Sequence, residues 1–456
     1  MAEPLTVAVV GHTNAGKTSL LRTLTRDTRF GTISAQPGTT RHVEREHLLV
    51  EGRAVLALVD TPGFEDSVGL LNLLEELPQD RHTDGIELLE LFCRHPSASG
   101  QFEQEAKIIG QLLVSDLIFY LIDARQPLLG KYRDELQILG YAARPVIPVL
   151  NFVAEAGDNI QHWRELLARL NFHASVLFDT VLYDFANEQQ LFAICQTVLP
   201  EQAANLEQLK QSRRQHWHTI ERAAVEAIAA LLLDLAAFRM TVAEQEEALP
   251  SAIAAMQNSV RRAEQGTAQA LVAIYQFPEQ ALATEALPVQ NGLWKRDLFD
   301  RELLALVGIE TSSAAAKGAA IGVGIDLMTG GLSLGAAAGT GAVVGTLWSG
   351  GRRFGADLLA RFRGYRFLKV DAATLGLVRL RAFELLAELQ RRGHAAQNGL
   401  AMTAVEAQHA ALSKPLLRLL QQAANRPEWC QLGGRQSGDA GRTEHLGKIA
   451  AALKAD

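Results

Sequence analysis

The feature that most constrains this chain is a glycine-rich loop set between an apolar run and a helical pattern. The stretch "LTVAVVGHTNAGKTSLLRTL" reads as a buried strand, a loop and a helix, and it contains Gly11-x4-Gly16-Lys17-Thr18. This is the spacing of a phosphate-binding loop (P-loop) in the strand-loop-helix context that the motif requires. Glycines let backbone N–H groups close around phosphate oxygens, and the helix N-terminus adds the positive end of its dipole. The stretch predicts a nucleotide phosphate site on an α/β sheet.

Two side chains of this loop have predicted roles in the chemistry. We expect Lys17 to hold the β and γ phosphates and Thr18 to place its hydroxyl on Mg²⁺. The other residues of the loop that we expect to bind nucleotide are Gly11, Asn14, Ala15, Gly16 and Ser19.

A second strand, "RAVLALVDTPGFED", ends at Asp60-Thr61-Pro62-Gly63. There Asp60 is placed to reach Mg²⁺ through water, and the Gly63 N–H is placed to sense the γ-phosphate. Between the two motifs lies "SAQPGTTRHVE". A threonine there can complete the Mg²⁺ shell, and we assign Thr40 to it with Thr39 as its rival. The predicted catalytic residues are thus Lys17, Thr40, Asp60 and Gly63, and the predicted Mg²⁺ ligands are Thr18, Thr40 and Asp60.

The motifs "GHTNAGKT", "PGTTR" and "DTPG", with the strand "SDLIFYLIDARQP", resemble the Era and MnmE branch of the translation-factor-related GTPases over roughly the first 200 residues. The resemblance implies a mainly parallel, doubly wound sheet and Mg²⁺-dependent GTP hydrolysis. The whole chain resembles a bacterial group in which such a GTPase precedes a helical domain of unknown function. We therefore expect a GTPase domain over 1–200 and a mostly α-helical domain over 201–456.

The residue after Gly63 is Phe64, where Ras-like proteins place a glutamine that orients the attacking water. A phenylalanine cannot do this by hydrogen bonding. Several relatives of this branch also have an apolar residue there and use K⁺, held partly by a P-loop asparagine, and Asn14 occupies that position. The resemblance therefore implies K⁺-assisted hydrolysis, while the alternative is that Asn14 only shapes the loop.

The base-reading segment departs from the family pattern. In "PVIPVLNFVAEAGDN" Asn151 is present, but Phe152 and Ala154 replace the Lys and Asp of Asn-Lys-x-Asp. Losing that bidentate carboxylate contact to guanine should cost on the order of 1–3 kcal/mol. Glu155 or Asp158 offers another carboxylate at a different spacing, although each also fits an exposed loop residue. Guanine preference therefore rests on the resemblance.

A long segment, 64–112, separates the Gly63 motif from the next predicted strand, Leu117–Asp123. Its apolar spacing predicts a helical insertion with breaks at Pro78 and around Pro96 to Gly100. The insertion lies directly after the residues that sense the γ-phosphate, so it could grip a partner or the second domain. A packed surface excursion with no signalling role fits the pattern equally well.

From about Pro200 the composition changes to Ala, Leu, Gln, Glu and Arg. Apolar residues from Trp217 to Leu235 recur at helical spacing, and further helical patterns run from Ser251 to Tyr275 and from Thr374 to Asn425. These patterns predict a helical C-terminal domain.

A Gly/Ala-rich apolar segment, 314–351, stands apart within this domain, and Asp326 is its only ionisable residue between Lys317 and Arg352. Glycines four apart predict a hairpin of two closely packed helices. Arginines and aromatic residues follow it as far as Lys369. One interpretation is a hairpin that lies on or in an anionic membrane, and the other is a tightly packed hairpin inside a soluble domain.

The chain has a net charge of -7, which gives no reason to expect a nucleic-acid partner. Its start, "MAEPLTVAVVGH", enters a predicted strand almost at once, so we expect a cytoplasmic protein, peripheral to the inner membrane if the hairpin docks there. The expected partners are GTP and GDP, an anionic membrane surface through 318–369, an unidentified protein, and a second copy of the chain when nucleotide is bound.

The sequence thus predicts a GTP-hydrolysing switch, dependent on Mg²⁺ and stimulated by K⁺, that couples nucleotide state to a helical effector domain. Two alternatives stay open. One is a nucleotide-binding scaffold with little hydrolysis, and the other is a GTPase associated with RNA or the ribosome.

Overall fold

The computed structural model describes residues 3–26, 44–77, 83–180, 184–243, 249–275, 289–290, 293–294, 297–299, 325–328, 365–391, 412–433 and 439–455. Residues up to His218 form one compact unit, and most of the remainder forms a second.

The N-terminal unit is built on a six-stranded sheet with the order β2-β3-β1-β4-β5-β6. Its strands are β1 (Leu5–Gly11), β2 (Glu44–Val50), β3 (Arg53–Asp60), β4 (Leu117–Asp123), β5 (Val146–Asn151) and β6 (Val176–Leu177). Only the β2–β3 pair is antiparallel, and every other pair is parallel. The predicted mainly parallel α/β sheet is confirmed.

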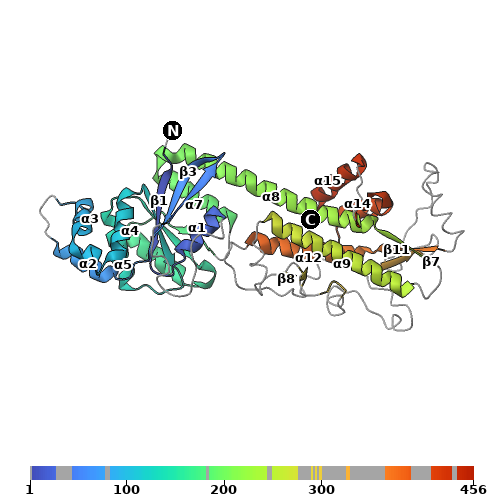
Figure 1. Ribbon diagram of the computed structural model, residues 1–456, viewed down its shortest axis with the longest axis horizontal. Coiled ribbons are helices and arrows are strands. Elements are labelled where there is room, and N and C mark those ends of the chain that lie inside the picture. The colour runs from blue at the N-terminus through green and yellow to red at the C-terminus, as the bar shows by residue number, and fades with distance from the viewer. Residues whose placement is uncertain are drawn as a thin grey trace. The chain divides into compact units, whose positions relative to one another are not determined.

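The central strand β1 is buried on both faces, which explains its unbroken apolar run. Val7 and Val9 pack into the core on one face, and Ala8 and Val10 pack into the core on the other. Figure 1 shows helices on both sides of this sheet. They are α1 (Lys17–Thr25), α2 (Ser67–Glu76), α3 (Gly85–Arg94), α4 (Glu103–Val114), α5 (Gly130–Tyr141), α6 (Asn159–Arg169) and α7 (Phe185–Val198), with the short turns η1 (Pro96–Ser99), η2 (Val153–Glu155) and η3 (Pro200–Gln202).

The predicted insertion contains α2, α3, η1 and α4. Its predicted break around Pro96 coincides with η1 between α3 and α4, and the one at Pro78 lies outside the described residues. Its apolar side chains belong to the core of the six-stranded sheet itself: Leu74, Phe92 and Ile108 are fully buried and share one cluster with Val10. The insertion is therefore an integral layer of the N-terminal unit.

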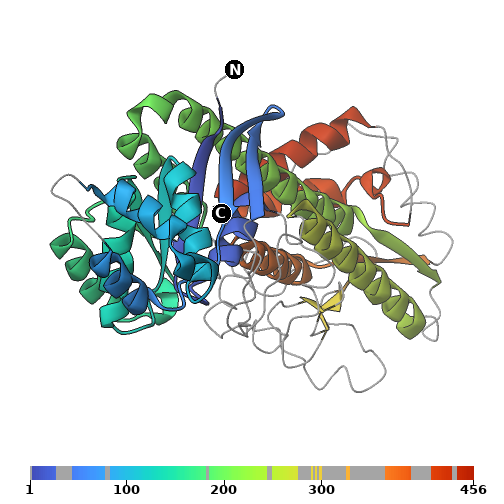
Figure 2. The ribbon, with the colours of Figure 1, turned by 60° about the vertical axis from the view of Figure 1, so that its left-hand side comes forward.

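The C-terminal unit is mostly helical, as predicted, with a small antiparallel sheet of order β10-β11-β7 and a strand pair β8-β9 (Figure 2). The predicted long helix is α8 (Ala203–Ala237), which begins within the first unit. The remaining elements are β7 (Arg239–Ala243), α9 (Leu249–Ile274), β8 (Val289–Gln290), β9 (Leu293–Trp294), β10 (Ile325–Met328), β11 (Tyr365–Val370), α12 (Ala372–Arg391), α14 (Lys414–Ala424), η8 (Pro427–Trp429) and α15 (Ala440–Ala455).

One part of the predicted Gly-rich hairpin is wrong. Within 314–351 the structure describes 325–328, and these residues form strand β10, paired antiparallel with β11 from Ile325↔Val370 to Met328↔Phe367. The ladder satisfies the backbone groups there, so tertiary pairing overrides the helical spacing of the glycines. The rest of the hairpin lies outside the described residues, and its docking on membrane stays a prediction. Among the described helices, none is long and apolar enough to cross a membrane.

A buried ion pair joins α9 to α12 in the C-terminal unit. Arg381 Nε lies 2.9 Å from Glu264 Oε1, and both side chains are almost fully buried. The guanidinium also lies 4.3 Å from the centroid of the Trp294 ring. Glu264 Oε1 has no hydrogen-bond donor among the described residues, so the contact lacks hydrogen-bond geometry. Burial raises the pKa of Glu264 to about 7, although Arg381 opposes the rise.

This pair predicts a pH dependence of stability. Because the folded-state pKa of Glu264 lies above its ordinary value of 4.5, its contribution to stability is present below pH 4.5 and is lost as pH rises through about 7. The wild type should lose stability relative to Glu264→Gln over that window, by on the order of 3 kcal/mol at most. Chemical denaturation at a series of pH values measures this.

The control is Glu226→Gln, which changes an exposed carboxylate on α8 and should keep the wild-type pH slope. If Glu264→Gln shares the wild-type slope, the carboxyl does not titrate in this range.

Candidate nucleotide-binding site

The loop between β1 and α1 takes a conformation that only glycine allows at two points. Gly11 has φ 152° and Gly16 has φ 96°. A Cβ at Gly11 would collide with the backbone oxygen of Leu121 in β4, and one at Gly16 would collide with the side-chain amide of Asn151. The two glycines of the motif therefore let the loop close against the ends of β4 and β5.

Lys17 begins α1 and lies almost fully buried under this loop. Its Nζ donates to the carbonyl of Gly11 at 3.1 Å and to that of His12 at 3.2 Å. Two of the three ammonium N–H groups are thereby fixed, and the third has no acceptor among the described residues. Burial lowers the pKa of Lys17, while the nearby charges of Asp60 and Glu135 oppose the shift.

Thr18 and Asp60 meet beside this lysine. The Thr18 hydroxyl donates to Asp60 Oδ2 at 2.7 Å, and Asp60 is 1% exposed. Its other oxygen, Oδ1, has no donor among the described residues, and burial raises the pKa of Asp60 to about 6 against the opposing charge of Lys17. A hydroxyl and a carboxylate with one unsatisfied buried oxygen fit Mg²⁺, which prefers such hard oxygen ligands.

The Gly63 motif packs directly on the P-loop. A Cβ at Gly63 would lie 2.7 Å from the Cα of Thr13. The next residue, Phe64, donates its backbone N–H to Gly11 at 3.3 Å, and its side chain is fully buried in the sheet core. The predicted residues Lys17, Thr18, Asp60 and Gly63 therefore converge, while Thr39 and Thr40 lie outside the described residues.

The remaining P-loop predictions differ in their surroundings. Asn14 is exposed and has a left-handed backbone, with φ 66°, which asparagine tolerates better than most residues. Ala15 is buried, and Ser19 is half-buried in the first turn of α1.

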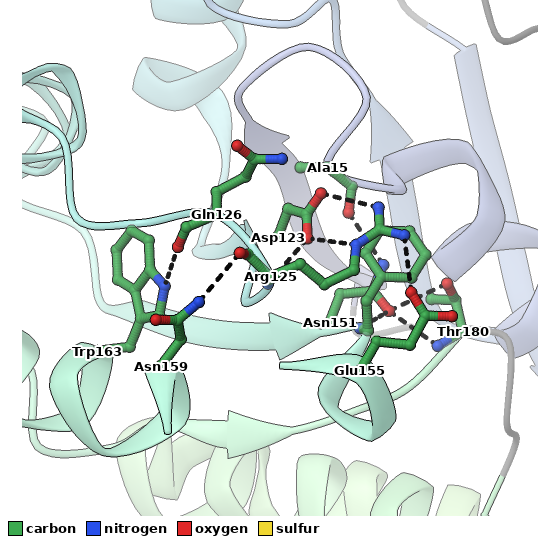
Figure 3. A network of polar contacts seen from close by, with 10 residues as sticks. Ala15, Asp123, Arg125, Gln126, Asn151, Glu155, Asn159, Trp163 and Thr180 are labelled. Carbon is green, nitrogen blue, oxygen red and sulfur yellow. Dashed lines mark hydrogen bonds and ion pairs between the residues drawn. The ribbon is translucent and has the colours of Figure 1, made fainter. Parts of the chain in front are cut away.

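The side chain of Asn151 joins three loops, as Figure 3 shows. Its Nδ2 donates to the Ala15 carbonyl at 2.9 Å. Its Oδ1 accepts from the backbone N–H of Thr180 at 2.9 Å, from the Thr180 hydroxyl at 3.1 Å and from the Phe152 N–H at 2.9 Å. The residue is fully buried. Sequence reasoning missed Thr180, because no familiar triplet marks the loop after β6.

A charged network at the ends of β4 and β5 was also missed. Arg125 makes two contacts of 2.9 Å with Asp123, and its Nη1 lies 3.3 Å from Glu155 Oε2 (Figure 3). The guanidinium stacks 3.9 Å from the centroid of Phe152. Sequence reasoning could have found Asp123 and Arg125 from their position at and just after the end of a buried strand, at the sheet edge where nucleotides bind.

A second missed network surrounds the buried carboxylate of Glu135 on α5. It contacts Nδ1 of His12 in the P-loop at 3.1 Å and accepts from the Tyr120 hydroxyl at 2.7 Å. Lys131 Nζ lies 2.7 Å from His12 Nε2. This network fixes the back of the P-loop to α5.

The segment after Gly63 is held by the insertion. The buried carboxylate of Glu105 on α4 accepts two consecutive backbone N–H groups, from Glu65 at 3.0 Å and from Asp66 at 2.9 Å. The Asp66 carboxylate in turn accepts from the Gly69 N–H at 2.8 Å and caps α2. These contacts connect the backbone just after Gly63 to two helices of the insertion, α4 and α2.

The sheet and the P-loop site define a GTPase domain of the P-loop class. Residues 6–152 match the model of a family described as "50S ribosome-binding GTPase". Residues 164–451 match the model of a family described as "Domain of unknown function (DUF3482)". Because this second match spans more than half of the chain, the chain belongs to the DUF3482 family.

Curated relatives each match about a quarter to a third of this chain. The tRNA modification GTPase MnmE of Alkaliphilus oremlandii is 31% identical over 121 residues, which are 26% of this chain and 25% of that protein. The probable GTP-binding protein EngB of Neisseria gonorrhoeae is 28% identical over 158 residues, 35% of this chain and 62% of its own. The chain thus spans less than two thirds of each of these relatives. The predicted resemblance to Era and MnmE is confirmed.

A crystal structure of Aquifex aeolicus Era bound to GDP·AlF4⁻ is 20% identical and has a TM-score of 0.31. The match covers 42% of this chain and 57% of that one.

Proposed function

We propose that this protein binds GTP and GDP and hydrolyses GTP with Mg²⁺, and that the nucleotide state acts as a switch. The observation that carries the proposal is the convergence of a buried Lys17, the Thr18–Asp60 pair and Gly63 around the closed P-loop. The relation of residues 6–152 to GTPases supports guanine nucleotides as the substrate.

The chain's own groups supply binding and charge stabilisation. Two carbonyl groups already orient the Lys17 ammonium. The free-energy cost of ordering this side chain when it binds the β and γ phosphates is therefore small. The backbone of the P-loop and the start of α1 add N–H donors. Thr18 and Asp60 would hold Mg²⁺, which when bound neutralises charge on the phosphate oxygens.

K⁺ stimulation through Asn14 is a finer part of the proposal. Phe64 is fully buried and cannot orient the attacking water. Another group must therefore stabilise the negative charge of the transition state, and a bound cation is one that could. Asn14 is exposed on the loop and offers an amide oxygen to a cation. Asparagine also tolerates the left-handed backbone of this position, so its presence there has a second, purely conformational explanation.

We propose that Glu105 couples the nucleotide state at Gly63 to the position of α4. A γ-phosphate that attracts the Gly63 N–H would pull on 64–66, and Glu105 holds the N–H groups of Glu65 and Asp66. Hydrogen bonds to a charged carboxylate are stronger than those between neutral groups, so we expect a shift of this backbone to be passed to α4.

The buried Phe64 also favours a second candidate, a scaffold that binds nucleotide and barely hydrolyses it. A peripheral membrane role through 318–369, a protein partner, a nucleotide-dependent dimer and an RNA-associated role are proposals from the sequence alone.

The phosphate site is tested with Lys17→Ala. Removing the ammonium takes away charge-assisted bonds to two phosphates, so GTP and GDP affinity should fall by roughly 100-fold or more. Equilibrium binding of a fluorescent nucleotide and release of phosphate measure the effect. Lys448→Ala, which changes an exposed lysine of α15, is the control. Unchanged binding in Lys17→Ala would remove the basis of the proposal.

The cation is tested by exchanging Na⁺ for K⁺ at constant ionic strength. We expect turnover to rise several-fold in K⁺ and the rise to vanish in Asn14→Gly. Glycine is the suitable replacement because it accepts the positive φ of this position and lacks the side-chain amide. Equal rates in the two salts for the wild type would leave Asn14 with a conformational role alone, and a slow rate in both would favour the scaffold.

The coupling is tested with Glu105→Gln, which keeps the shape of the side chain and removes its charge. The variant should bind GDP within about threefold of the wild type but lose preference for a non-hydrolysable GTP analogue by about tenfold. Glu103→Gln is the matched control, since Glu103 lies on the same helix and is exposed. Calorimetric titration with both nucleotides decides between coupling and a structural role, for which both affinities would fall together.

A further inference from the structure

The loop after β5 lies against the P-loop although it lacks the family's base-reading Asp. Asn151 ties the start of this loop to the Ala15 carbonyl. A Cβ on Gly16 would lie 3.4 Å from Cζ of Phe152, so the phenyl ring borders the phosphate site. In open α/β sheets ligands bind beyond the carboxyl ends of the parallel strands, and this loop follows such an end.

Two carboxylates and one guanidinium gather at this edge. Asp123 is mostly buried, and Arg125 engages both of its oxygens at 2.9 Å. Glu155 is more exposed, at 59%, and only its Oε2 contacts Arg125. Its Oε1 has no donor among the described residues. With one positive and two negative charges, the group carries a net charge of -1, so it favours a ligand edge that presents N–H donors.

Arg125 fixes the position of the Glu155 carboxylate, and other contacts hold Arg125 in place. The Phe152 ring stacks on the Arg125 guanidinium, whose N–H groups donate to the two carboxylates. The Arg125 carbonyl accepts from Asn159 Nδ2 at 3.0 Å, and the following carbonyl, of Gln126, accepts from Trp163 Nε1 at 3.2 Å (Figure 3). Arg125 is therefore rigid at both ends, and the carboxylate it holds is better ordered than an isolated exposed glutamate.

We propose that Glu155 reads the guanine base in place of the missing Asp, with Arg125 as the residue that positions it and the Phe152 ring as an apolar border of the base site. The proposal rests on the proposed nucleotide-binding function. Guanine presents N1–H and the N2 amino group as adjacent donors, which match a carboxylate. Adenine presents an acceptor at N1, and xanthine presents an oxygen at C2, so both are disfavoured by the negative group.

The test is competition binding of GTP, ITP, XTP and ATP to the full chain. The wild type should prefer GTP to XTP and ATP, and it should bind ITP less well because inosine lacks the N2 amino group. Glu155→Gln should lower GTP affinity by about 10–100-fold and reduce the difference between GTP and ITP. Asp158→Asn is the matched control, because Asp158 is an exposed carboxylate in the same loop and should leave all four affinities within about threefold.

Arg125→Met tests the positioning role. This variant should have a smaller ratio of GTP affinity to ATP affinity, while its ATP affinity changes little. A purely structural loss would lower the affinity for all four nucleotides equally. Circular dichroism confirms that each variant is folded.

The outcomes separate the inference from the function on which it rests. Equal affinity of the wild type for the four nucleotides overturns the base-reading proposal and leaves the phosphate site intact. A base preference that survives Glu155→Gln and disappears in Asp158→Asn also overturns it. Failure of the folded wild type to bind any of the four contradicts the proposed function itself.

Discussion

The side-chain amide of Asn151 is the contact on which the site depends most. It lies at the end of β5 and bonds to the P-loop through Ala15 and to the loop after β6 through Thr180. These segments are far apart in the chain, and each contributes a buried backbone group to the hydrogen bonds of Asn151. One buried side chain therefore sets the spacing between the phosphate loop and the loops that border the base.

The two halves of the site differ in how completely they follow the family pattern. The phosphate half combines a buried lysine with a buried aspartate, and each group partly offsets the cost of burying the other's charge. The base half keeps Asn151 but replaces the expected carboxylate with a network centred on Arg125. We infer that phosphate binding and base recognition are separable in this protein, with different side chains responsible for each.

Much of the fold could be predicted because it depends on local patterns. The apolar run of β1, Pro96 at the start of η1, and the helical spacing of α8 each correspond to an observed element. The phosphate residues were equally accessible, since Gly11 to Thr18 are adjacent in sequence and their geometry follows from the strand-loop-helix context.

The rest could not be predicted, because it arises from contacts between distant residues. Arg125 meets Glu155 only because β4 and β5 are neighbours in the sheet. Glu105 meets the N–H groups of Glu65 and Asp66 only after α4 has folded back across the core. Strand β10 is a wrong prediction and not a missed contact. Glycine spacing predicted a helix at 325–328, but pairing with β11 determined the structure there.

The central claim is that nucleotide state acts on the insertion through the backbone after Gly63. Hydrogen–deuterium exchange of the wild type, with GDP and with a non-hydrolysable GTP analogue, tests it directly. The account predicts that exchange at the backbone N–H groups of Glu65 and Asp66 and along α4 differs between the two states, while α15 in the C-terminal unit serves as an internal reference for global stability. Identical exchange at these positions, with both nucleotides bound at saturation, would contradict the claim that this protein is a switch of the kind described.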